Sequence, residues 1–210
     1  MAHLLKASPL NDRQARWTGV IDSAARDLLR QIEDVLEFSR LSRGQALPQR
    51  HEFDPARLAA QALARAERHG GKPGVVIRLV LAPQLPARLT GDAERTDQIL
   101  HHLLANALKF TDSGTITVTV GAERGHDDGR PHLLLQVRDT GIGMDPSQIE
   151  RLLRPFEQGD GGTARCFGGI GLGLALVDEC VRALEGHIRI DSLPGQGTNV
   201  EIRLPVTDRP

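Results

Sequence analysis

Apolar side chains in the first quarter of the chain recur at steps of three and four residues, which places them on one face of an α-helix. The members of this stripe are Ile21, Ala24, Leu28, Leu29, Ile32, Val35 and Leu36. Asn11 precedes the helix and Gln14 stands three residues later, which predicts an N-terminal capping box. Because one helix cannot bury such a face alone, the stripe predicts a partner helix, as in a helical bundle.

Gly and Pro interrupt the pattern between residues 44 and 49, so we place a domain boundary there, with residues 1–48 before it and 49–210 after it. Beyond the boundary, helices are expected over 54–69 and 92–109, as a short helix from Asp145, and from the glycine-rich stretch to residue 184. Strands are expected over 75–81, 115–120, 133–137, 187–190 and 198–204, the second and third as antiparallel neighbours. Since the order lacks regular βαβ alternation, the pattern predicts an α+β fold with helices on one face of the sheet.

The composition of the chain limits which partners and which cellular setting are expected. The 210 residues carry 26 basic and 27 acidic side chains, a formal charge of −1, with no basic run of the kind that binds nucleic acid. Cys166 and Cys180 have no metal-ligand spacing, so a reducing cytoplasm is the expected setting. No apolar segment is long enough to span a bilayer, although a longer parent protein can still be anchored in the inner membrane.

The predicted helix 92–109 carries polar side chains on one face. Gln98, His102, Asn106 and Lys109 follow at steps of four, four and three residues. An amide oxygen is a ligand that Mg²⁺ accepts beside phosphate oxygens, and an ammonium group binds phosphate as a point charge. The alternative is an ordinary solvated helix face.

Two further segments offer groups for a nucleotide. Asp139 at a strand end can accept a hydrogen bond from an exocyclic amine. Gly141 and Gly143, which follow it, allow the backbone to lie against a planar ring; a plain turn is the alternative. Residues 168–174, Gly-Gly-Ile-Gly-Leu-Gly-Leu, lead into an apolar helix whose N-terminus suits phosphate; a flexible linker is the alternative. Neither a Rossmann fingerprint nor a P-loop is present.

In this order the segments resemble the nucleotide-binding boxes of the histidine kinase family, within the superfamily of gyrase, Hsp90 and MutL. The matching stretches are 92–111 with Asn106-Ala107-Leu108-Lys109-Phe110 (N box), 139–143 (first glycine box), 155–158, Pro-Phe-Glu-Gln (F box), 169–174 (second glycine box) and 195–198, Gly-Gln-Gly-Thr. The resemblance implies the Bergerat fold, a two-layer α/β sandwich with a mixed, mostly antiparallel sheet, and binding of ATP with Mg²⁺.

The resemblance also implies roles for individual residues. Asn106 would hold Mg²⁺, Lys109 would contact phosphate, and Asp139 would accept the adenine amino group. Residues 143–169 would form a lid that Phe156 anchors, and Arg165 in the lid either reaches the terminal phosphate or is simply solvated. The implied nucleotide-binding set is His102, Asn106, Lys109, Asp139, Gly141, Gly143, Phe156, Arg165, Gly169, Gly171, Leu172, Gly173 and Thr198.

Residues 8–40 resemble the dimerisation and phosphotransfer helices of hybrid histidine kinases, which implies a phosphoacceptor domain, a response regulator or receiver, and a homodimer through the first predicted helix as partners. The acceptor motif, a histidine followed by an acidic residue and an Arg-Thr-Pro run, is absent, so these residues alone are expected not to autophosphorylate. His102 stands where the family commonly has Asn. A serine kinase or ATPase of the same superfamily and a non-catalytic binding module are the alternatives.

Overall fold

The long N-terminal helix forms as predicted. The computed structural model describes residues 10–43, 48–125, 129–157 and 171–207, and within them α2 spans Asp12–Ser42. Asn11 Oδ1 accepts a hydrogen bond from the backbone N–H of Gln14 at 2.9 Å, and Gln14 Oε1 accepts one from the N–H of Asn11 at 3.1 Å. The capping box is therefore confirmed, and it satisfies two donors that the start of a helix otherwise leaves free.

Among the described residues, a five-stranded sheet, three helices that cover it and the short helix α5 form the body of the protein. The strand order is β2-β4-β5-β7-β6; β2 runs parallel to β4, and every other pair is antiparallel. The strands are β2 Val75–Leu81, β4 Gly114–Arg124, β5 Pro131–Asp139, β6 His187–Ser192 and β7 Thr198–Pro205. The helices are α3 Pro55–Gly70, α4 Ala93–Phe110, the short α5 Pro146–Leu152 and α7 Gly173–Ala183.

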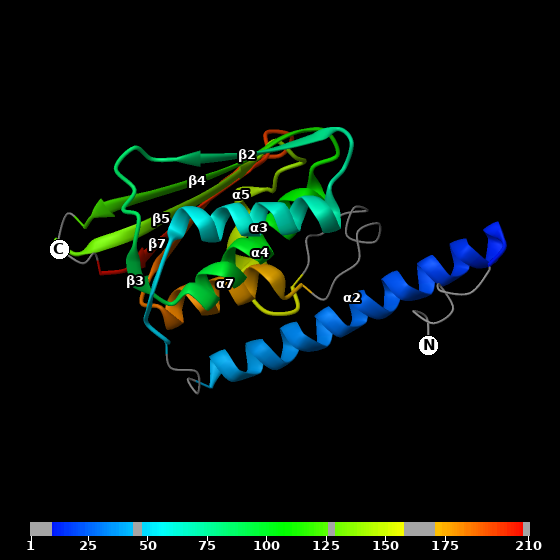
Figure 1. Cartoon of the computed structure of the whole chain (residues 1–210), viewed down its shortest axis with the longest axis horizontal. Helices are drawn as coiled ribbons and strands as arrows, with labels where there is room; N and C mark the ends of the chain where they lie inside the picture. Colours follow the sequence, from blue (N-terminus) through cyan, green and yellow to red (C-terminus); the bar gives the residue numbers. More distant parts are fainter. Residues whose placement is uncertain (1–9, 44–47, 126–128, 158–170, 208–210) are drawn as a thin grey trace.

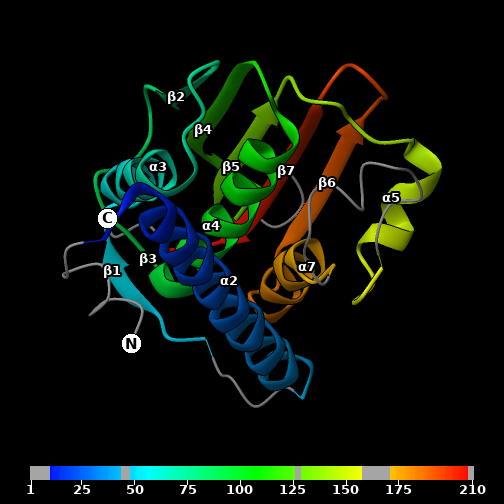
Figure 2. The ribbon, with the colours of Figure 1, turned by 90° about the vertical axis from the view of Figure 1, so that its right-hand side faces the viewer.

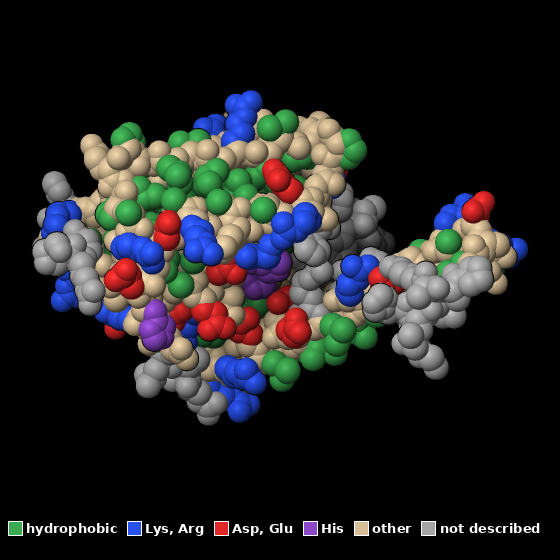
Figure 3. Space-filling view, viewed as in Figure 1, with side chains coloured by type: hydrophobic (Ala, Val, Ile, Leu, Met, Phe, Trp, Pro, Cys, Tyr) green, Lys and Arg blue, Asp and Glu red, His purple; other side chains and the backbone are tan. Residues whose placement is uncertain are grey.

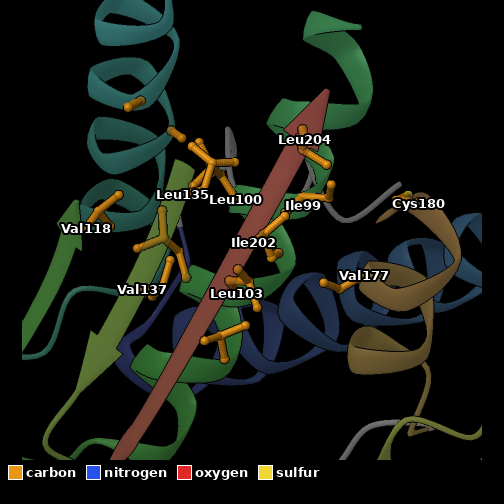
Figure 4. Close-up of a cluster of buried hydrophobic side chains, with 14 of the residues drawn as sticks. Ile99, Leu100, Leu103, Val118, Leu135, Val137, Val177, Cys180, Ile202 and Leu204 are labelled. Atoms are coloured by element: carbon orange, nitrogen blue, oxygen red, sulfur yellow. The ribbon is translucent and has the colours of Figure 1, made fainter. Parts of the chain in front are cut away.

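Helices α3, α4 and α7 lie on one face of the sheet, with α4 near the middle (Figures 1 and 2). Figure 4 shows the apolar side chains that fill the space between the layers, drawn from α4, α7 and strands β4, β5 and β7. Ile99, Leu100 and Ile202 are fully buried there. The α+β class and the two-layer sandwich with a mixed, mostly antiparallel sheet are thus confirmed.

Helix α2 lies against this body and extends beyond it (Figure 1). It contacts α7 along part of its length, and Leu41 near its end is buried. Most of its apolar stripe stays exposed, namely Ile21, Leu28, Leu29, Ile32, Val35 and Leu36, and so do Trp17 and Val20 outside the stripe. Figure 3 shows hydrophobic side chains gathered along one edge of this helix.

A small second sheet joins the linker after α2 to the start of α4. β1 His51–Phe53 pairs antiparallel with β3 Leu89–Gly91, two strands too short for the hydrophobic pattern to reveal. Asp92 caps α4, because its Oδ1 accepts from the N–H of Arg95 at 3.0 Å, while its Oδ2 accepts from the N–H of Gln49 at 2.9 Å. One carboxylate therefore fastens the linker to the first turn of α4. In the described parts of the chain no helix has the length and apolar character needed to cross a membrane.

Candidate nucleotide-binding site

Asp139 ends β5 with its carboxylate largely buried. Its Oδ1 accepts hydrogen bonds from the backbone N–H of Gly141 at 2.8 Å and of Thr198 at 3.3 Å. Burial raises the pKa of Asp139, and these two hydrogen bonds oppose that rise. Among the described residues nothing donates to Oδ2, so this oxygen is free to accept a hydrogen bond from a bound amine.

Two glycines allow close backbone contacts around Asp139, one with the end of α4 and one with Asp139 itself. A Cβ atom on Gly141 would overlap the carbonyl oxygen of Phe110, and the N–H of Ile142 donates to that same oxygen at 3.2 Å. Gly197 has a φ of +80°, and a Cβ there would overlap the carbonyl oxygen of Asp139. Glycine is required at both positions because the backbones touch directly.

Asn106 points at the start of α7. A Cβ atom on Gly173 would lie 3.5 Å from Asn106 Nδ2 and 3.6 Å from its Oδ1. The N-cap of α7, Leu172, makes no side-chain capping hydrogen bond, and the first turn of this helix contains no acidic residue. The positive end of α7 and the amide of Asn106 therefore face one another, an arrangement suited to phosphate and a divalent cation.

Lys109 lies on the last turn of α4, next to the segment that Gly141 contacts. It is half-buried, its Nζ lies 4.9 Å from the centre of the Phe110 ring, and burial lowers the pKa of Lys109. A phosphate group would stabilise the charged ammonium form that burial disfavours. The chemistry of this side chain thus fits an anionic ligand.

The donor set fits Mg²⁺ in the way that nucleotide sites hold it. The amide oxygen of Asn106 is a hard neutral ligand beside a helix end that attracts phosphate oxygens. Within the described ranges no cluster of three or more His, Cys, Asp or Glu side chains is placed to bind a metal. A cation here would therefore take most of its ligands from phosphate and water, which is the usual habit of Mg²⁺.

Residues 91–208 match the family described as histidine kinase-, DNA gyrase B- and HSP90-like ATPases. The chain belongs to this ATPase family. The autoinducer 2 sensor kinase/phosphatase LuxQ of Vibrio cholerae is 37% identical over 207 residues, 98% of this chain and 24% of LuxQ. The sensor histidine kinase RcsC of Escherichia coli K12 is 33% identical over 203 residues, 97% of this chain and 21% of RcsC. The chain spans about a quarter of the length of these relatives.

Solved structures of histidine kinases share the fold of this ATPase-family chain. Full-length ShkA in complex with AMPPNP gives a TM-score of 0.80 at 28% identity, covering 100% of this chain and 42% of ShkA. The histidine kinase AdeS of Acinetobacter baumannii gives a TM-score of 0.71 at 19% identity, covering 96% of this chain and 88% of AdeS. The second likeness shows the fold alone.

Several predicted residues lie close together in the candidate site. Asp139, Gly141 and Thr198 meet at the end of β5, Lys109 follows on α4, and Asn106 faces Gly173. Gly143, with a φ of +65°, packs against the backbone of Leu193, and Gly171, with a φ of +75°, packs against the backbone of Glu157. Leu172 is buried before α7.

Other predicted residues lie elsewhere or are not described. Phe156 is 60% exposed and has a φ of +66°, a strained value for a bulky residue. Arg165, Gly169 and the rest of residues 158–169 of the predicted lid lie outside the described residues. His102 faces α2, with its Nε2 3.9 Å from Asp34 Oδ1, and Gln98 hydrogen-bonds with the side chain of Glu37. The polar side chains of α4 thus do not line one cavity. Gln98 and His102 face α2, whereas Asn106 faces α7.

Two residues that shape the site gave no signal in the sequence. Ser192 Oγ accepts from the N–H of Met144 at 2.8 Å and donates to the carbonyl of Gly197 at 2.9 Å, which joins the loops on either side of Asp139. Lys72 Nζ donates to the carbonyls of Lys109 and Thr111 at 3.3 and 3.0 Å and so closes the end of α4. Both contacts join segments far apart in the chain, which local spacing does not reveal.

Proposed function

We propose that this chain is the ATP-binding catalytic part of a sensor histidine kinase, which presents the γ-phosphate of ATP·Mg²⁺ to a histidine on a phosphoacceptor helical domain. The phosphoryl group would then pass to a response regulator or receiver domain. Family membership, the likeness to LuxQ and RcsC, and the AMPPNP bound by ShkA support this proposal. The observation that carries it in this chain is that Asn106 faces Gly173 from α4, the helix whose end packs against the loop after Asp139.

Each residue of the site would have a separate task. Asp139 Oδ2 accepts the adenine amino group, and Gly141 lets the ring lie close to the backbone. Asn106 holds Mg²⁺, which neutralises phosphate charge, while Lys109 and the first turn of α7 bind phosphate oxygens. Phosphoryl transfer depends mainly on such positioning and charge neutralisation, so no nucleophile from this chain is needed.

The acceptor must come from outside the 210 residues, because none of their histidines begins the acceptor motif. We therefore propose that this chain alone does not autophosphorylate and acts on a separately supplied phosphoacceptor domain. We also propose that the exposed stripe of α2 binds another helix, in a homodimer with a second copy or in a bundle with the acceptor helix. The expected setting is the cytoplasmic side of a membrane-anchored parent.

The test is transfer from radiolabelled ATP, with Mg²⁺, to an intact phosphoacceptor domain. The expected product is phosphohistidine, which is acid-labile, and Asn106→Ala should abolish it. Asn199→Ala is the matched control, since the Asn199 side chain hydrogen-bonds with Gln136 at 2.9 Å, away from Asn106. Undiminished transfer by Asn106→Ala would contradict the metal assignment, and acid-stable phosphoserine would contradict the kinase class.

A further inference from the structure

Helix α2 and helix α4 meet through two polar contacts one helical turn apart. Asp34 on α2 faces His102 on α4, and Glu37 on α2 hydrogen-bonds with Gln98 on α4. Asp34 and Glu37 are three residues apart, and Gln98 and His102 are four apart, so each pair lies on one helix face. The two contacts therefore lie next to one another between the helices.

The contact between His102 and Asp34 is well shielded from water. The imidazole is 10% exposed and the Asp34 side chain 23% exposed, with His102 Nε2 3.9 Å from Asp34 Oδ1. The pair attracts as ions only when the imidazole carries its proton. Imidazoles change charge between about pH 5 and 8, so this contact changes strength in the physiological range.

The surroundings of the contact are rich in acid. A hollow of about 790 Å³ opens beside it between α2 and the start of α4. The charged side chains near the contact on its own two helices are Glu33, Asp34, Glu37 and Arg40 on α2 and Asp92, Glu94, Arg95 and His101 on or before α4. Helix α7, which packs against both helices, carries Asp178, Glu179 and Arg182. The acids outnumber the two arginines that line the hollow, so a proton on His102 adds positive charge beside a region with more acids than bases.

We propose that Asp34 and His102 are positioning residues, which hold the ATP-binding domain against α2 as an ion pair and hold it more weakly once His102 loses its proton. This rests on the proposed function for what is positioned, because Asn106 follows His102 by one helical turn. The contact would thus set the direction in which the phosphate end of the site faces relative to α2.

The sign of the pH effect follows from linkage. A carboxylate beside an imidazole favours the protonated ring, so this contribution to docking is present at low pH and is lost as the ring deprotonates. At Glu37, burial, followed by Asp34 and Glu94, raises the pKa, while Arg95 and the hydrogen bond with Gln98 lower it, so the contact with Gln98 itself favours the ionised carboxylate. The pH dependence near neutrality therefore comes from the contact between His102 and Asp34, which strengthens as pH falls.

Distances between spin labels on the whole 210-residue chain, measured without nucleotide, test the proposal independently of phosphotransfer. Labels on Val20→Cys in α2 and Val76→Cys in β2 replace exposed side chains on the two bodies. Cys166→Ser removes one native thiol, while Cys180 is buried and stays unlabelled. Dilution with unlabelled protein restricts the signal to pairs within one molecule.

The docked fraction of the wild type should fall roughly fivefold relative to the undocked fraction between pH 6 and pH 8. His102→Asn, which does not titrate, should remove this dependence, and Asp34→Asn should lower docking at pH 6 alone. Glu37→Gln is the matched control and should retain the dependence. The proposal fails if wild type and His102→Asn show the same pH profile, or if Glu37→Gln abolishes the profile.

Discussion

The side-chain amide of Asn106 faces Gly173, the first residue of α7, at a distance that leaves room for a methyl group and little more. A Cβ atom on Gly173 would lie 3.5 Å from Asn106 Nδ2, which is an ordinary van der Waals contact. Packing would thus tolerate alanine in place of Gly173. Its small size matters for what binds between the two residues.

Gly173→Ala should therefore separate binding from stability. The protein should fold with a free energy of unfolding within about 1 kcal/mol of the wild type, because alanine suits a helix and meets no overlap. Affinity for an ATP analogue with Mg²⁺ should fall about tenfold, since the methyl group occupies the phosphate end of the site. Calorimetric titration and denaturant unfolding measure the two effects.

Gly141→Ala is the counterpart of that variant. Its methyl group would overlap the carbonyl of Phe110, so the loop or the end of α4 must move. We expect a loss of about 1–3 kcal/mol in the free energy of unfolding. Equal stability of the two alanine variants would contradict the close backbone contact at the end of α4.

Asp139→Asn should weaken nucleotide binding without weakening the fold. Burial raises the pKa of Asp139, so its ionised form is less favourable in the folded protein than in the unfolded chain at neutral pH. That contribution to stability is fully present below the unfolded pKa and is lost as pH rises through the raised folded pKa. The neutral amide removes this dependence, and at pH 7 its melting temperature should equal or exceed that of the wild type. Thermal unfolding between pH 4 and pH 8, with ATP-analogue titration at pH 7, measures both outcomes.

Cys180 should be inert in the folded protein. Burial, followed by the charge of Glu37, raises the pKa of this thiol to about 12, and the residue is fully enclosed. In a Cys166→Ser background, iodoacetamide at pH 8 should leave Cys180 unmodified until denaturant is added, as peptide mass spectrometry would show. Rapid alkylation under native conditions would mean that α7 opens readily.

The apolar stripe of α2 should control self-association. Replacing Leu29 and Ile32 together by Gln removes two exposed apolar side chains from the stripe while helix propensity changes little. Sedimentation velocity should show less dimer than for the wild type at equal concentration. Val76→Gln, which changes an exposed apolar side chain on β2, is the matched control and should leave association unchanged.

Local signals predicted most of the fold. Asn11, Asp54, Asp92 and Asp145 each cap the helix that the sequence assigned to them. The strand 75–81 forms with the predicted bounds, and β4 and β5 pair antiparallel as expected, although both run longer. These elements are encoded by spacing within one segment, which the chain shows directly.

Long-range relations were harder to read from the sequence. β1 and β3 have three residues each and exist because they pair with one another. The row on α4 was expected to line one cavity, yet the position of α2 divides it, since Gln98 and His102 face that helix while Asn106 faces α7. A helix face shows which side chains lie together but does not show which neighbour they meet.

Asp92 ties the linker that follows α2 to the start of α4. One oxygen of this carboxylate caps α4 and the other holds the N–H of Gln49 in the linker. A movement of α2 would thus reach the first turn of the helix that carries Asn106 through this carboxylate, in addition to the direct contacts of α2 with α7. Asp92→Ser would keep a helix cap while releasing the linker, so that a movement of α2 would no longer reach the first turn of α4 through this residue.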